Sequence, residues 1–273
     1  MRGVSRDALK RGLEAFERTV GVLPDAAAPS EVSEGLYAVA DLLDREPSLR
    51  RALTDPASTA AARRGLVDSL FDGQLAALPL EVFRDLVADR WNTAADLRQA
   101  VEVLAASAAM RAAECAGVLD EVEDELFRFA RLLARENELR AALTDPALPA
   151  SRKTALLRDL LGSRAQPITV RLVEIAVTRP RGGSIEHALD ALSKLAAQRR
   201  ERYIARVRVA RAMDPAQTER LAASLARTYG RQVQLQIDVD PSVLGGLEVK
   251  VGDEVLNGTV ARSLETVRRR LGA

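Results

Sequence analysis

A sixteen-residue segment occurs twice in this chain, ninety positions apart. The first copy spans residues 42–57 and the second spans residues 132–147, and twelve of the sixteen positions are identical. Both copies end in Ala-Leu-Thr-Asp-Pro-Ala. Two copies are too few for a solenoid, which generally needs three or more repeats. The repeat therefore predicts a duplicated helical bundle.

Helix boundaries are marked in the same way in each copy. The Asp-Pro pairs at 55–56 and 145–146 should end a short helix, because the residue before a proline avoids the α region. Ser58 or Thr59 in the first copy, and Pro149 in the second, should then start the next helix. In each copy that helix should bury one face with i, i+1, i+4, i+5 spacing. The face is formed by Leu66, Val67, Leu70 and Phe71 in the first copy, and by Leu156, Leu157, Leu160 and Leu161 in the second.

Further helices are expected in the first copy near residues 5–20, 31–46, 48–54 and 79–91. The last of these carries Val82, Phe83, Leu86 and Val87, with Trp91 interpreted as a packing residue at its end. In the second copy, the corresponding apolar residues are Leu172, Val173, Ile175 and Ala176.

The stretch from residue 95 to residue 136 contains no proline and one glycine, Gly117. Apolar or small residues recur along it in steps of three and four, which predicts a connecting helix. Unbroken, it would measure about 63 Å at 1.5 Å per residue. A kink or a break at Gly117 is the alternative to a continuous helix, since a glycine costs about 1 kcal/mol relative to an alanine in a helix. We expect bundle copies at residues 1–110 and 111–202.

From residue 203 onward the pattern changes from helical to alternating. Ala205, Val207 and Val209 alternate with arginines, and residues 233–239 alternate in the same way, as half-buried strands do. Between them, Asp214, Pro215 and Gln217 occupy the N-cap, N1 and N3 positions of a helix. This region is predicted to be a separate domain, residues 203–273.

The domain should continue with a hairpin and a final helix. Leu247, Val249 and Val251 alternate before the two-residue turn Gly252-Asp253. A helical apolar stripe follows at Val260, Leu264, Val267 and Leu271. The expected order is β-α-β-β-α. The whole chain is thus predicted to be mainly α, a duplicated helical bundle followed by a small α+β domain.

Residues 238–260 resemble the C-terminal motif of the delta subunit of F-type ATP synthases, called the oligomycin-sensitivity-conferring protein in mitochondria. The likeness is carried by Asp-Pro-Ser, Gly-Gly-Leu, Val-Gly-Asp and Asn-Gly-Thr-Val in that order. Two adjacent glycines before a strand suggest a backbone requirement that a Cβ would oppose. The motif residues are Asp240, Pro241, Leu244, Gly245, Gly246, Leu247, Val249, Val251, Gly252, Asp253, Val255 and Gly258. The enlarged helical part resembles the actinobacterial form.

This resemblance implies a peripheral-stalk subunit without catalytic residues or cofactors. The helical bundle would bind the alpha subunits of the catalytic head, and the C-terminal domain would bind the membrane-anchored b subunit. The chain would then sit peripherally on the cytoplasmic face of the bacterial plasma membrane. An alternative is a free-standing helical adaptor that links unrelated partners, and an enzyme is a weaker third possibility.

Composition excludes several other classes. The formal net charge is +1, which argues against a nucleic-acid binder. No apolar run approaches the roughly 20 residues of a membrane span, and the N-terminus lacks the apolar segment of a signal peptide. Direct membrane insertion is therefore not expected. Cys115 is the single cysteine and fits a small apolar residue in a helix.

Catalytic and cofactor motifs are also missing from the sequence. His187 is the single histidine, no Walker-type glycine loop occurs, and no nucleophile elbow accompanies His187. The acidic run at 120–125 lacks the glycine and oxygen spacing of a calcium loop. Residues 251–255 also resemble the hairpins of biotinyl and lipoyl carriers, but Lys250 lies on the strand and not at the turn.

Residues 194–211 form a basic segment that contains seven basic residues and one acidic residue, Glu201. It is either a solvated surface or a docking patch for an acidic partner, where opposite charges would speed and orient association. The docking candidates are Arg199, Arg200, Arg202, Arg206 and Arg208.

Overall fold

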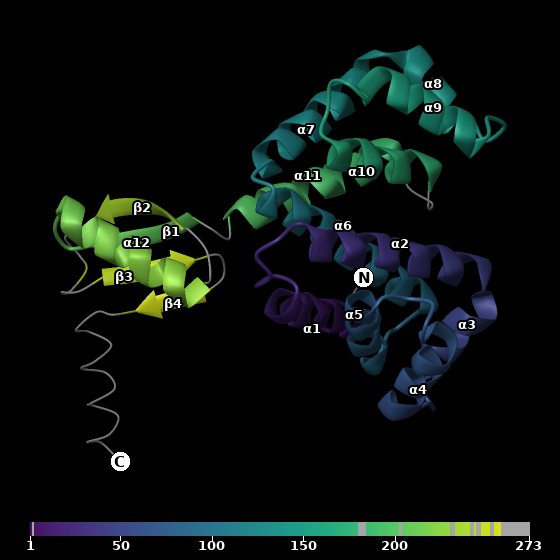
Figure 1. Ribbon diagram of the computed structural model, residues 1–273, viewed down its shortest axis with the longest axis horizontal. Coiled ribbons are helices and arrows are strands. Elements are labelled where there is room, and N and C mark those ends of the chain that lie inside the picture. Colours follow the sequence, from purple (N-terminus) through teal and green to yellow (C-terminus); the bar gives the residue numbers. More distant parts are fainter. Residues whose placement is uncertain are drawn as a thin grey trace. The chain divides into compact units, whose positions relative to one another are not determined.

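The computed structural model describes residues 1, 3–179, 184–201, 204–229, 233–240, 243, 247–251 and 254–257. The chain divides into two compact units, Met1–Ala196 and Ala197–Ala273. The first is helical and the second contains a small sheet (Figure 1).

The first copy of the repeat forms a helical bundle. Its helices are α1 (Val4–Thr19), α2 (Ala27–Arg45), α3 (Pro47–Ala52), α4 (Ala60–Phe71), α5 (Ala77–Ala88) and α6 (Ala94–Cys115). Thr59 caps α4 as predicted, because its side-chain oxygen accepts a hydrogen bond from the N–H of Ala62 at 3.2 Å. Trp91 is buried, and its Nε1 donates to the carbonyl of Leu86 at 3.0 Å, which confirms its packing role.

The second copy repeats this pattern. It contains α7 (Leu119–Arg135), α8 (Asn137–Thr144), α9 (Ala150–Leu161), α10 (Pro167–Thr178) and α11 (Ile185–Glu201). Adding 90 to the bounds of α4 and α5 gives the bounds of α9 and α10 without an offset. Asp145 ends α8 and Pro149 precedes α9, as the sequence predicted.

Helix α6 belongs to both copies. It begins at residue 94, ninety positions after α1 begins at residue 4, so it is the last helix of the first copy and the first helix of the second. All residues from 104 to 113 are buried, as expected for a helix enclosed on every side. Most of them are alanines, which allow neighbouring helices to approach closely. The predicted boundary between the copies, at residue 110, lies inside α6. The division at this residue therefore stays a prediction that rests on the sequence repeat.

The prediction of a continuous helix over residues 95–136 is wrong. Helix α6 ends at Cys115 and α7 begins at Leu119, with Gly117 between them at φ 72°. The N–H of Gly117 donates to the carbonyl of Glu114 at 3.0 Å, and that of Val118 donates to the carbonyl of Ala113 at 2.9 Å. These two bonds form a Schellman motif. Gly117 therefore terminates α6, as the alternative interpretation allowed.

The predicted buried face of α4 is correct at two of its positions. Val67 and Phe71 are buried, and the Phe71 ring meets Phe83 of α5 edge-on at 5.5 Å between centroids. Leu66 is partly buried. Leu70 was expected in the core but is 41% exposed, because the buried row of α4 runs through Arg63, Val67 and Phe71 in steps of four. In α9, Leu157 is buried and Leu156, Leu160 and Leu161 are partly buried.

The second unit contains β1 (Ile204–Val209), α12 (Pro215–Tyr229), β2 (Gln234–Val239), β3 (Leu247–Val251) and β4 (Glu254–Asn257). The strand order is β2-β1-β3-β4, with β1 parallel to β2 and the other pairs antiparallel. The parallel pair requires a crossover, which α12 provides. Asp214 and Gln217 form the predicted reciprocal cap, with hydrogen bonds of 2.7 and 3.0 Å.

The predicted order β-α-β-β-α had one strand too few. The returning arm of the hairpin, β4, pairs with β3 in a register that sets Val251 opposite Glu254, so it adds a fourth strand. The hairpin itself is confirmed by this pairing. The predicted final helix at residues 260–271 lies outside the described residues.

Candidate functional site

Two apolar residues of the C-terminal motif, Leu247 and Val249, belong to the core of the small domain. Leu247, Val249 and Val251 of β3 lie opposite Val209, Val207 and Ala205 of β1. Val249 is 2% exposed and packs in one cluster with residues of β1 and α12. Val255 lies on β4, opposite Lys250. These motif residues stabilise the sheet and present no reactive group.

Asp240 fastens the end of β2 to β1. Its N–H donates to the carbonyl of Val209 at 2.9 Å, and its carboxylate accepts a hydrogen bond from Arg208. Arg208 also donates to Glu248 of β3 at 3.3 Å. The hydrogen bond to Asp240 raises the pKa of Arg208. Asp240 is thus a structural residue at the junction of three strands.

The other motif residues lie outside the described part of the chain: Pro241, Leu244, Gly245, Gly246, Gly252, Asp253 and Gly258. The backbone role of Gly245 and Gly246 stays a prediction.

The five candidate docking arginines do not share one environment. Arg199 in α11 is buried, whereas Arg200 is exposed. Arg206 and Arg208 are exposed on the same face of β1, and Arg206 lies opposite Lys250. Arg202 lies outside the described residues. Docking through this segment remains a prediction, and only Arg200, Arg206 and Arg208 are described as open to solvent.

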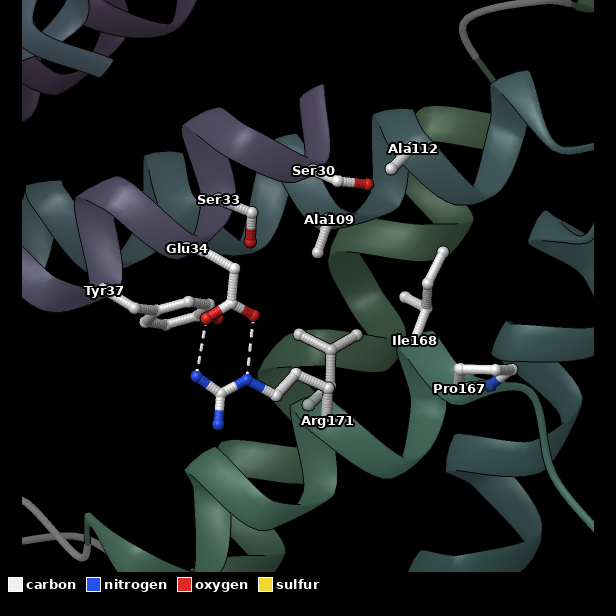
Figure 2. A pocket seen from close by; sticks show the side chains of 10 residues that line it. Ser30, Ser33, Glu34, Tyr37, Ala109, Ala112, Pro167, Ile168 and Arg171 are labelled. Atoms are coloured by element: carbon white, nitrogen blue, oxygen red, sulfur yellow. Dashed lines mark hydrogen bonds and ion pairs between the residues drawn. The ribbon is translucent and has the colours of Figure 1, made fainter. Parts of the chain in front are cut away.

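A cavity of about 190 Å³ lies where the two copies meet (Figure 2). Helix α2 of the first copy, the shared helix α6, and α10 of the second copy supply its walls. The lining residues are Ser30, Ser33, Glu34, Tyr37, Ala109, Ala112, Pro167, Ile168, Arg171 and Leu172.

Two charged pairs join α2 to α10 and to Arg179, the residue that follows α10. Arg171 donates to both carboxylate oxygens of Glu34, at 2.8 and 2.6 Å (Figure 2). This hydrogen bonding lowers the pKa of Glu34 and raises that of Arg171. About two turns further along, Arg179 pairs with Asp41 and lies 5.4 Å from the centroid of the Tyr37 ring. The first and second copies are thus held together by paired side chains as well as by α6.

The lining of this cavity combines one charged pair with mostly small and apolar side chains. The charged groups of the cavity, Glu34 and Arg171, are paired with each other, and the rest of its lining is Tyr37 together with small or apolar residues. Among the residues that the structure describes, no three His, Cys, Asp or Glu side chains gather as metal ligands. No helix in that part of the chain has the length and apolar character needed to cross a membrane.

Comparison with known proteins gives the family. The model of the ATP synthase delta (OSCP) subunit matches residues 105–271. The ATP synthase subunit delta of Streptomyces griseus is 48% identical over 272 residues, covering 99% of each chain. The corresponding subunits of a Parafrankia species and of Thermobifida fusca are 47% and 42% identical, again over 99% of each chain. This chain belongs to the ATP synthase delta (OSCP) subunit family.

The match to the delta family begins inside α6, at residue 105. The second copy and the C-terminal domain therefore correspond to the family model, and most of the first copy precedes it. The full-length relatives include that first copy. The resemblance inferred from the motif at 238–260 is confirmed, and so is the enlarged form seen in actinobacterial delta subunits.

Proposed function

We propose that this chain joins the catalytic head of the ATP synthase to the membrane-anchored b subunit. In this proposal the helical unit binds alpha subunits of the head and the C-terminal domain binds b. Membership of the delta family itself makes the chain a structural, non-catalytic part of the peripheral stalk. The observation that carries the proposal is the similarity to delta subunits along the whole chain.

The helical unit has the stiffness that a stator needs. It buries one continuous apolar core with residues from α1 through α11. The pairs Glu34–Arg171 and Asp41–Arg179 add specific contacts between the copies. A part that holds the head against rotation has to resist shear, and dense packing with fixed polar pairs resists it.

The C-terminal domain forms a separate compact unit with a core of its own. Separate units can bind separate partners, which supports assigning b to this domain. The charged face of β1, with Arg206 and Arg208, is the surface we propose for the contact. Attachment to b would hold the chain at the cytoplasmic face of the plasma membrane without insertion.

A free-standing adaptor is the less favoured alternative. It would explain the bundle and the absence of catalytic motifs in the sequence. It would not explain 42–48% identity to delta subunits across the full length.

Calorimetric titration can test the division of labour between the two units. Helix α11 ends at Glu201, so fragments 1–201 and 203–273 divide the chain after this helix and before β1. We expect 1–201 and the full chain to bind the isolated head, and 203–273 and the full chain to bind the soluble part of b. Head binding by 203–273 alone would overturn the assignment. The binding of b should weaken with added salt, because exposed charges are screened.

A further inference from the structure

Helix α5 of the first copy and α10 of the second occupy equivalent places in the repeat but carry opposite charges. The bounds of the two helices differ by ninety positions without an offset, as do those of α4 and α9. Three charged residues lie in α10 or directly after it, and each has a residue of the opposite charge ninety positions earlier. The equivalent residues are Glu81 and Arg171, Arg84 and Glu174, and Asp89 and Arg179.

One of these reversals inverts a complete ion pair between neighbouring helices. In the first copy, Arg84 of α5 pairs with Asp68 of α4. In the second copy, Glu174 of α10 accepts a hydrogen bond from Nε of Arg158 of α9 at 2.7 Å. Asp68 and Arg158 are themselves ninety positions apart. The two copies therefore make the same contact with acid and base exchanged.

The other two reversed positions contact different helices in the two copies. Arg171 of α10 and the following Arg179 bind two acids of α2. In the first copy, Oδ1 of Asp89 accepts a hydrogen bond from Arg11 of α1 at 2.8 Å. If α5 took the place of α10 on α2, the equivalent acids of the first copy would face the two acids of α2. Each helix thus meets opposite charges only in its own place.

An exchange of α5 and α10 during folding would also mismatch the inverted ion pair. With α10 beside α4, Glu174 would face Asp68, and with α5 beside α9, Arg84 would face Arg158. Like charges set against each other cost free energy. The cost is largest for a buried charge that loses its partner, and Glu174 is only 4% exposed. The mispairing of Glu174 with Asp68 is therefore the strongest barrier to the exchange.

We propose that the reversed charges direct α5 and α10 each to its own copy while the chain folds, a property that goes beyond the proposed function and does not depend on it. The apolar rows of the two copies are alike, since Val67 and Phe71 of α4 correspond to Leu157 and Leu161 of α9. Apolar burial is non-directional, so it discriminates little between such rows. Charge supplies the missing discrimination by opposing the wrong pairing as well as favouring the correct one.

Refolding of the full chain from urea tests the proposal, with tryptophan fluorescence as the readout. Trp91 is the only tryptophan of the sequence, and its Nε1 donates to the carbonyl of Leu86, so its signal reports on α5. The double variant Asp68→Arg with Arg84→Glu keeps an ion pair between α4 and α5 but gives it the sign of the second copy. Chains with exchanged helices must separate them before they fold. The ratio of slow-folding to fast-folding chains should therefore rise about ten-fold, which corresponds to about 1.4 kcal/mol of lost discrimination.

The matched control reverses a second ion pair between the same two helices, Arg64→Asp with Asp85→Arg. Nη2 of Arg64 lies 3.3 Å from Oδ1 of Asp85, and both side chains are about half exposed. The equivalent residues of the second copy, Thr154 and Ile175, are uncharged. Reversal here creates no favourable contact between the copies, so this variant should refold like wild type. Slow phases from proline isomerisation should be equal in all three proteins, because no proline is changed.

An unchanged proportion of slow-folding chains in the first double variant would overturn the proposal, and so would an equal rise in the control. Wild type provides a second measurement that needs no substitution. Added salt screens exposed charges, so it should raise the proportion of slow-folding wild-type chains, and the absence of any rise would also overturn the proposal. Neither measurement involves the head or b, so their outcome leaves the proposed function untouched.

Discussion

Replacement of Gly117 by alanine tests the reason why α6 ends where it does. Gly117 adopts φ 72°, and an added Cβ there would meet no heavy atom within 4 Å. The substitution therefore changes backbone conformational energy without creating a clash. An L residue in the left-handed region costs about 1–2 kcal/mol. Alanine also reduces the entropy of the unfolded chain, which offsets about 0.4–1 kcal/mol of that cost.

The net effect of Gly117→Ala should be a loss of about 1 kcal/mol in the free energy of unfolding. For a unit of about 200 residues this lowers the melting temperature by about 2–4 °C. Gly65→Ala is the matched control. Gly65 lies inside α4 at an exposed position, and a Cβ there also meets nothing within 4 Å. Alanine should stabilise this helix by about 0.5–1 kcal/mol.

Differential scanning calorimetry of the two single variants and the double variant measures these opposite shifts. The two effects should nearly cancel in the double variant, because the two added methyl groups share no neighbours. A melting temperature for Gly117→Ala at or above that of wild type would refute the reasoning. It would mean that the break between α6 and α7 does not depend on the left-handed residue.

Two further predictions concern a charged pair and a helix cap. Pairing with Arg171 depresses the pKa of Glu34 below 4.5, so its stabilising contribution is complete above pH 4.5 and is lost as the pH falls through the folded-state pKa. The difference in melting temperature between wild type and Glu34→Gln should therefore shrink in acid, and a constant difference would count against the pair. Asp214→Ala removes the cap of α12 and should destabilise the C-terminal domain by about 1 kcal/mol in urea unfolding. Asp214→Asn, which can still accept the bond from Gln217, should lose less, and equal losses would exclude capping as the cause.

Local signals in the sequence were sufficient for most of the fold. The Asp-Pro pairs, the cap at Thr59 and the capping box at Asp214 each act within a few residues, so the helix boundaries near them were predictable. The break at Gly117 was harder to predict, because a glycine is compatible both with the interior of a weakened helix and with the end of a helix. The left-handed conformation of Gly117 decides between them, and it is seen only in the structure.

The sequence did not predict which charged residues are buried. Arg63 is 4% exposed and donates to the carbonyls of Val87 and Ala88 at 2.7 and 2.8 Å, closing the end of α5. A helical arginine normally suggests a solvated surface. The pairing of Glu34 with Arg171 joins residues 137 positions apart. Only the folding of α10 back over α2 brings them together, so the cavity beside them could not be predicted either.

The shared helix α6 has a mechanical consequence for a subunit that must resist torque. Two domains that meet at an interface can slide when their side chains yield. Here the two copies share the backbone of α6. A force on one copy therefore reaches the other along a single helix, which is held together by its own axial hydrogen bonds. Separating the copies would bring buried residues of the segment 104–113 into water. The joint between the copies therefore has the axial stiffness of a continuous helix in addition to the contacts between packed side chains.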